Sequence, residues 1–337
     1  IGVDKNFNAV FEPDSGDVLP SWWILKASEG DVFQYKSYKI LDFEFASLLP
    51  PVRLAFAPQK RSIFLPLKGK IVQYNLDSHI VMDSIDLNPE ITYDNYALDY
   101  SENMLLISQS SYFAKSSIVL YSLNETKKIL EKEIGQNIIQ SVLYKNPDTD
   151  ELCIATISVG PFGQDSSKLY LINANDGNII YQKVIGNNAN YIQNYNNKYL
   201  IITLMGSNKI IIHNIADNQE YEIHTNTTGW NGPSVAKMFN LNSQFVPNEM
   251  NNWLGIATYN SENQIGFLNN QFEFQRIGNN LQVEGKIEDF AVATTPYGVC
   301  IASAKYLKED YTPNDSVQID FIDFSTGINE GNDYELV

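Results

Sequence analysis

A four-strand unit that recurs along the whole chain is the feature that most constrains the fold. In each unit, short apolar runs alternate with turns rich in Gly, Asn, Asp and Ser, a pattern typical of antiparallel strands. The ends of the third strands align at positions about 48 residues apart, close to the roughly 40 to 50 residues of four-stranded propeller blades. The aligned positions are Tyr35, Tyr74, Tyr121, Ile172, His213, Leu268 and Ile322.

The third strands carry apolar side chains on both alternating faces, as in KIIIHNI and KLYLINA. A sheet packed between two neighbours needs this pattern, whereas an isolated meander would have a polar face. Stacking such units around an axis buries both faces of every sheet. The sequence therefore predicts an all-β fold, a seven-bladed β-propeller of four-stranded antiparallel blades. We expect a single domain, 1–337, with blades at about 7–46, 52–88, 95–135, 139–187, 191–226, 234–279 and 288–337.

The first and last units bear on how the ring of seven blades would close. The first has four expected strands, NAVFEP, SWWILKA, DVFQYKS and KILDFEF, with a turn at 36–38 between the last two. The seventh unit ends in its own fourth strand, DYELV. We therefore expect closure by packing between blades rather than by a shared strand; addition of residues 1–6 to the last blade is the alternative.

Charge and hydropathy exclude two classes of partner. The formal net charge of −17 and the pI near 4.5 repel nucleic-acid phosphates and anionic bilayers, and no basic patch offsets them. No apolar run reaches the roughly 18 residues that a transmembrane helix needs. We interpret the acidity as a source of solubility, with attraction to cations or basic partners as the alternative.

The two cysteines and the first residue bear on the cellular compartment of the protein. Cys153 and Cys300 lie in apolar runs, where a buried thiol behaves as a small hydrophobic group. A disulfide bond between the two cysteines is the alternative. The chain begins at Ile1 without a leader, so we expect a mature chain from which an upstream targeting segment was removed. A lipid anchor upstream of Ile1 is one form that this segment would take. The hypothesis is an exported bacterial protein, periplasmic or at the cell surface.

The run LYLINANDGNIIYQKVIG, 169–186, joins two apolar strands through Asp176-Gly177, a strong hairpin signal. It resembles the repeat of YVTN-type and quinoprotein-like propellers, in which such a turn joins two strands and the second ends near an aromatic residue. The resemblance implies a propeller. Quinoprotein dehydrogenases also have a repeated Trp and an adjacent cysteine pair, whereas Tyr181 stands at the Trp position here and the two cysteines lie in different units. We therefore expect no quinone cofactor.

Four long connections predict a binding face. In a four-strand blade, the connection from strand two to strand three and the connection between blades emerge on the same face. The insertions at 108–117, 156–168, 226–234 and 303–316 are of these two types, whereas the opposite face has one obvious insertion, 243–252, and the segment DSGDVLP, 14–20. Loops on a rigid scaffold often carry recognition, and aromatic residues are favoured in contacts with ligands; the alternative is that each ring packs against its own loop. The candidate binding residues are Tyr112, Phe113, Phe162, Trp230, Tyr306 and Tyr311.

The ionisable residues show no metal or catalytic motif. The three histidines lack a ligand spacing, and no nucleophile elbow, phosphate-binding glycine loop or paired-acid motif occurs. We therefore expect no metal and no cofactor. Calcium is the alternative, since two acidic segments carry oxygen ligands, although the same residue types suit turns. Their acids are Asp148, Asp150, Glu151, Asp310, Asp315 and Asp320.

These observations predict an exported, non-catalytic binding module that engages a glycan, a peptide or a protein through the face with the four insertions. One alternative is a propeller enzyme, a hydrolase, lyase or degenerate quinoprotein, with acids converging on the axial channel. Propeller enzymes collect catalytic residues from several blades, so no contiguous motif is required. The other alternative is a structural scaffold of the cell envelope with a protein partner.

Overall fold

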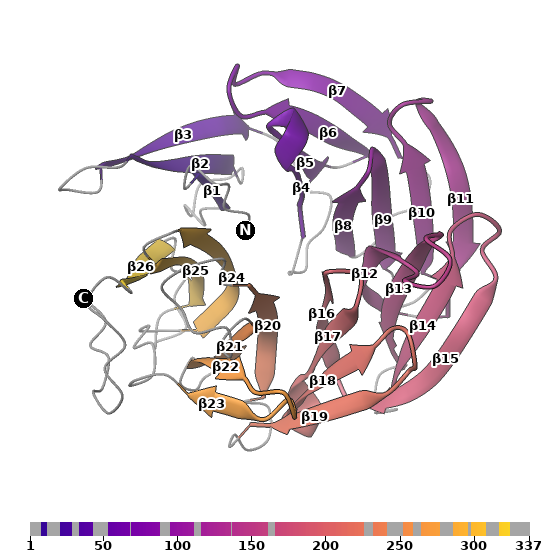
Figure 1. Ribbon diagram of the computed structural model, residues 1–337. Helices are drawn as coiled ribbons and strands as arrows, with labels where there is room; N and C mark the ends of the chain where they lie inside the picture. Colours follow the sequence, from indigo (N-terminus) through magenta and orange to yellow (C-terminus); the bar gives the residue numbers. More distant parts are fainter. Residues whose placement is uncertain are drawn as a thin grey trace. The chain divides into compact units, whose positions relative to one another are not determined.

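The computed structural model describes residues 8–11, 21–28, 34–42, 53–67, 69–87, 95–110, 116–135, 137–160, 166–225, 232–240, 252–258, 264–276, 286–295, 298–307 and 317–323. In the strands between 8 and 42 and from 293 onward, only the backbone is described. Within these ranges the chain is all-β, with two 3-10 turns, η1 (Pro58–Lys60) and η2 (Met205–Ser207), as its only helical elements (Figure 1). The all-β prediction is confirmed.

The chain forms two compact units, one comprising 43–207 and 211–220, the other 1–42, 208–210 and 221–337. The first unit holds three complete four-stranded antiparallel sheets, each with its strands in chain order. They are β4 (Ala55–Ala57), β5 (Ser62–Leu67), β6 (Lys70–Asn75) and β7 (Val81–Asp86); β8 (Asn95–Ser101), β9 (Met104–Ser110), β10 (Ser117–Ser122) and β11 (Lys127–Glu133); and β12 (Ile138–Lys145), β13 (Leu152–Val159), β14 (Ser167–Asn173) and β15 (Ile179–Gly186).

Two further sheets have four strands, and two have three described strands. The four-stranded ones are β16 (Ala189–Tyr195), β17 (Tyr199–Leu204), β18 (Lys209–Asn214) and β19 (Glu220–His224); and β20 (Pro233–Phe239), β21 (Trp253–Thr258), β22 (Gln264–Leu268) and β23 (Phe274–Arg276). The three-stranded ones are β1 (Asn8–Phe11), β2 (Ser21–Ser28) and β3 (Gln34–Asp42); and β24 (Lys286–Thr295), β25 (Gly298–Leu307) and β26 (Val317–Asp323).

The turn expected at 36–38 in the first unit is wrong. These residues lie inside β3, which pairs with β2 from Gln34 to Asp42. The segment Lys-Ser-Tyr contains no Gly, Asn or Pro to favour a reversal, so pairing with the long strand β2 continues through it. The expected fourth strand of the last unit, DYELV, lies outside the described residues.

In three successive sheets, a β-bulge interrupts the pairing of the third strand with the fourth at the same position of the repeat. The bulge falls immediately before Tyr74 in β6, Tyr121 in β10 and Ile172 in β14. These are three of the positions aligned from the sequence. The period of the sequence repeat therefore corresponds to a structural register, in which each third strand kinks at the same point before its hairpin turn.

A capped turn follows three of the aligned positions. The side-chain Oδ1 atoms of Asn75, Asn173 and Asn214 each accept the backbone N–H two residues later, at 2.8 to 3.2 Å. The residue four positions after each Asn has a φ between 57 and 71°. Gly177 takes this left-handed position in the Asp-Gly hairpin, which is therefore a longer turn closed between Asn173 and Asn178 rather than a two-residue loop.

Within the unit 43–207 and 211–220, consecutive sheets pack through their faces, and their first strands β4, β8, β12 and β16 lie beside one another. Apolar clusters fill the spaces between the sheets. Third strands are buried on both faces: Leu169, Tyr170, Leu171 and Ile172 of β14 are all at most 9% exposed. The two-sided apolar pattern thus arises because each sheet has a neighbour on either side.

Candidate functional site

Five of the six candidate binding residues lie outside the described residues: Tyr112, Phe113, Phe162, Trp230 and Tyr311. The backbone of Tyr306 belongs to β25, so the connection expected from 303 begins only after Leu307. The strand bounds give the type of each connection: 111–116, 160–166 and 308–316 join second to third strands, and 225–232 joins two sheets. The binding role of the six residues stays a prediction.

The end of the strands from which two of these connections leave carries buried hydroxyl groups. We call Ser108, Ser110, Ser141, Thr156 and Ser158 the hydroxyl layer; all five are at most 6% exposed. The layer lies between the sheet β8–β11 and the sheet β12–β15, which meet through β8, β9 and β12. The second strand β9 ends within the layer, at Ser110, and the second strand β13 ends one residue beyond it, at Val159.

Strand alternation places these hydroxyl groups on facing surfaces. Along β9, Ser108 and Ser110 continue the face that begins with Leu106. Leu106 belongs to the apolar cluster between the two sheets. Along β13, Thr156 and Ser158 continue the face of Ile154, a member of the same cluster, and Ser141 pairs with Thr156 across the strands. Apolar side chains of the same cluster lie beside these hydroxyl groups, since Ile118 pairs with Ser108 and Tyr170 pairs with Thr156 across the strands.

The hydrogen bonds of the layer are incomplete within the part of the chain that the structure describes. The Thr156 hydroxyl donates to Ser141 Oγ at 2.9 Å. Ser108 Oγ is buried and has no hydrogen-bond partner among the described residues, and the same holds for Oδ1 of Asn137, next to β12. A buried polar atom without a partner is costly, and in native proteins it is usually satisfied by water or a bound group.

Ionisable groups on the first strands bear on the alternative of a catalytic channel. Oδ2 of the half-buried Asp99 on β8 accepts the backbone N–H of Leu143 on β12 at 2.6 Å. Burial raises the pKa of Asp99 to about 6, and the hydrogen bonds from the backbone of Leu143 and Tyr100 oppose that rise. The carboxyl group thus connects two neighbouring sheets.

The buried Arg53 connects three sheets. Its backbone forms a parallel bridge to Ala97 of β8, and its Nη2 donates to the carbonyl of Asn190 on β16 at 3.3 Å. Its guanidinium lies 4.7 Å from the ring centre of Tyr191, a cation–π contact. With Asp99, this residue gives the first strands a set of polar cross-links, which explains these charges without a reaction.

A second polar cluster involves His213, which lies in a third strand as the sequence predicts but whose partners the sequence did not reveal. His213 is fully buried, its Nδ1 lies 3.3 Å from Glu220, and its ring centre is 5.4 Å from that of Tyr181. Lys183 pairs with Glu220 at 2.7 Å. Burial lowers the pKa of His213, so the imidazole is neutral near pH 7. The cluster connects β15, β18 and β19.

Among the described residues, no group of three or more His, Cys, Asp or Glu is arranged to hold a metal ion. Of the calcium candidates in the first acidic segment, Asp148 and Asp150 are exposed, and Asp150 lies 3.6 Å from Lys145. Asp310 and Asp315 lie outside the described residues. Cys153 is a buried free thiol. No helix in the described ranges is long and apolar enough to cross a membrane.

No protein-family model and no curated protein matches the chain. Three solved structures with β-propeller folds are similar to it. The first, Kuenenia stuttgartiensis hydrazine synthase, has a TM-score of 0.63 at 9% identity and covers 97% of this chain and 95% of its own. A chain of the mitotic checkpoint complex has a TM-score of 0.64 at 8% identity, covering 94% and 87%.

The third structure, BBS1N in complex with ARL6DN, has a TM-score of 0.58 at 11% identity and covers 96% of this chain and 97% of its own. At such identities the likeness concerns the fold alone. Together with the antiparallel sheets it shows that the fold is of the β-propeller type.

Proposed function

We propose that this chain is a seven-bladed β-propeller that acts as a non-catalytic binding module and engages its ligand through the face that carries the four insertions. Seven sheets in the described residues, five with four strands and two with three, support the blade count. The ligand is a glycan, a peptide or a protein. We also propose export to the periplasm or cell surface, which cell fractionation with an antibody against the chain would test.

The observation that carries the proposal is the type of the four connections. In an antiparallel four-strand meander, the connection from strand two to strand three and the one leading to the next sheet leave from the same end of the strands. Each of the four insertions joins strands in one of these two ways. The opposite connections include short turns in the hairpins β6–β7 and β14–β15 and one long connection, 240–252, between β20 and β21.

Two observations favour binding over catalysis. The oxygen of Asp99 accepts a backbone N–H of the neighbouring sheet, and Arg53 contacts two other first strands, so both charged groups serve the packing of the sheets. Two of the three similar structures are, by their descriptions, complexes of proteins. That is compatible with a protein ligand for this chain.

The test is a double substitution on the insertions, Tyr112→Ala with Trp230→Ala, assayed against arrays of glycans and peptides and by pull-down. We expect loss of at least tenfold in affinity for a ligand that the unmodified chain binds, because aromatic anchors dominate binding energy. Met82→Ala, at a side chain that is 56% exposed on β7, is the matched control and leaves binding unchanged. Full affinity in the double variant would contradict the assignment of this face.

A further inference from the structure

We propose that strand β15 is a self-association edge, at which a second copy of this chain adds its own β15 in antiparallel orientation. β15 is the last strand in the order of its sheet. One of its two edges pairs with β14, and none of the described strands pairs with the other edge. This association is a property beyond the proposed ligand binding, because it involves an outer sheet edge and not the insertions.

Aliphatic side chains are exposed along β15. Of the seven large hydrophobic side chains that are exposed where burial is described, three belong to this strand. They are Ile179, Ile180 and Val184, at 44, 51 and 55% exposure. Outer edges present unpaired backbone N–H and C=O groups, and an edge that also exposes aliphatic side chains is a template for pairing with another strand.

The two faces of β15 differ in how they are covered. Lys183 lies on the face toward the sheet β16–β19, where its Nζ pairs with Glu220 of β19 at 2.7 Å. Gln182 and Val184 alternate with Lys183 and therefore lie on the opposite face, and both are exposed. Pairing with β14 is uninterrupted from residue 181 to residue 184. A regular stretch of strand thus carries an uncovered face beside an open edge.

The charge of β15 favours a second copy of this chain as the occupant. The strand contains no acidic residue, although the chain has 40 Asp and Glu, and its one cation, Lys183, is paired with Glu220. Two copies of β15 therefore meet without the repulsion expected elsewhere on a protein of formal net charge −17. The three other outer strands of five or more residues with described side chains all carry acids: Asp83 and Asp86 in β7, Glu131 and Glu133 in β11, and Glu220 and Glu222 in β19.

β15 also has a self-complementary register. In an antiparallel pair of identical strands related by a two-fold axis, a register centred on Gln182 places this residue opposite its own copy. The same register places Ile180 opposite Val184 and Tyr181 opposite Lys183. Aliphatic groups then meet aliphatic groups, an amide meets an amide, and an ammonium group meets an aromatic ring, all of them favourable cross-strand pairs.

The other outer strands lack this property. A register centred on the middle residue of β11 places Lys128 opposite Lys132, and one centred on Glu222 of β19 places that carboxylate opposite its own copy. Like charges directly opposite each other are destabilising. A register centred on the fourth residue of β7 places Met82 opposite Asp86, an apolar group against a charge. Self-complementarity is therefore a property of β15 and not of every blade edge.

The test is sedimentation equilibrium of the full chain. The paired edges form a seam much smaller than a standard interface of roughly 1,600 Å², so we expect a reversible monomer–dimer equilibrium with a Kd on the order of 100 µM. The Kd should fall by roughly threefold between about 50 and about 500 mM NaCl, because salt screens the repulsion of two acidic chains. A chain that stays monomeric to about 300 µM, three times that Kd, overturns the proposal. Assembly beyond dimers also overturns it, because a two-fold seam is closed.

Two charged substitutions test the register. Val184→Lys and Ile180→Glu each set a charge against an aliphatic group of the second copy, and we expect each to weaken self-association by roughly tenfold. In an equimolar mixture the two variants should pair with each other. The register then places the new cation opposite the new carboxylate, while the remaining Ile180 still faces the remaining Val184. Because a folding defect in either variant would not be repaired by mixing, absence of recovery overturns the register.

Met82→Lys is the matched control, since Met82 is 56% exposed on the outer strand β7. We expect this variant to associate like the unmodified chain, and an equal loss would show a general effect of the added charge and overturn the assignment to β15. Tyr112→Ala with Trp230→Ala should also dimerise normally. Loss of dimers in that double variant would move self-association to the insertions, whereas loss of ligand binding alone concerns only the proposed function.

Discussion

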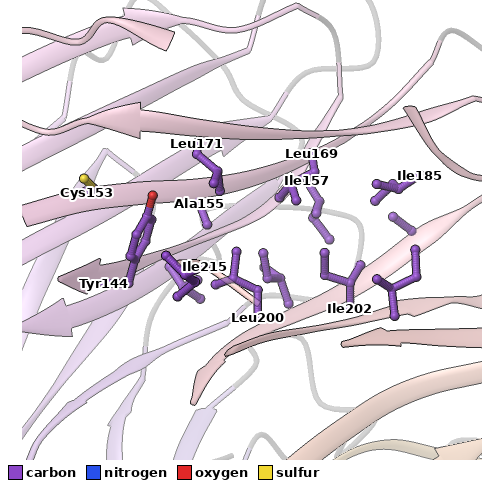
Figure 2. Packing of buried hydrophobic residues seen from close by; sticks show 14 of the residues in the cluster. Tyr144, Cys153, Ala155, Ile157, Leu169, Leu171, Ile185, Leu200, Ile202 and Ile215 are labelled. Carbon is purple, nitrogen blue, oxygen red and sulfur yellow. The ribbon is translucent and has the colours of Figure 1, made fainter. Parts of the chain in front are cut away.

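Two neighbouring interfaces in the unit 43–207 and 211–220 share a topology but differ in chemistry. The interface between the sheets β12–β15 and β16–β19 is largely apolar, with Leu200 and Ile202 of β17 facing Ala155, Ile157 and others (Figure 2). Its buried Gln140 and Ser167 accept backbone N–H groups of β16. The interface between the sheets β8–β11 and β12–β15 combines an apolar cluster with the hydroxyl layer, in which Ser108 Oγ has no partner among the described residues. The comparison shows that the repeat fixes how the sheets stack, while a few positions decide how the buried polar groups of an interface are satisfied.

The largest expected effect lies in the interface between the sheets β12–β15 and β16–β19. Ile202 is fully buried, and Ile202→Ala removes its packing and leaves a cavity. We expect the free energy of unfolding to fall by about 3 kcal/mol in urea denaturation, the middle of the range for such truncations. Val81→Ala, at an exposed position on β7, serves as the control. A loss below about 1 kcal/mol would mean that this interface collapses around the gap and does not carry the stability of the unit.

A pH-dependent effect is expected at the interface with the hydroxyl layer, because Asp99 connects its two sheets. The folded-state pKa of about 6 lies above the ordinary value of 3.8, so the folded protein holds this proton more tightly than the unfolded chain does. The stability that protonated Asp99 contributes is full below about pH 4 and is lost as the pH rises through about 6.

Asp99→Asn should remove that dependence while its amide oxygen still accepts the N–H of Leu143. Since Asp99 is half-buried, we expect a gain of about 2 kcal/mol in the free energy of unfolding at pH 7 and almost none at pH 4. Urea titrations at both pH values measure it, and Asp83→Asn on β7 controls for the lost charge. An equal effect at the two pH values would show that ionisation of Asp99 is not the cause.

The sequence predicted the register of the fold better than the contacts between sheets. Tyr74, Tyr121 and Ile172 could be aligned because each precedes its own hairpin, a local signal, and all three lie at the same bulge. Ser108 and Thr156 face the same interface from opposite sides, and no local pattern links residues of two different sheets. The insertion that was expected to include Tyr306 begins later because β25 continues through it.

A smaller effect is expected from the one hydrogen bond that the hydroxyl layer makes internally. Thr156→Val keeps the shape of the side chain but removes the donor to Ser141 Oγ. We expect a loss of about 1 kcal/mol in urea denaturation, the usual net value of such a bond. In Thr156→Val with Ser141→Ala the two losses should not add, because the double variant leaves no hydroxyl of this pair behind. Additive losses would mean that the two hydroxyl groups act independently.

The smallest expected effect has the opposite sign and separates the two kinds of buried serine. Ser108→Ala removes a hydroxyl without a partner among the described residues, so we expect the free energy of unfolding of the ligand-free chain to rise by about 0.5 kcal/mol. Ser62→Ala removes a bonded hydroxyl of equal burial and should lower it by about 1 kcal/mol. A loss in Ser108→Ala as large as that in Ser62→Ala would show that Ser108 already has a stable partner, such as a bound water.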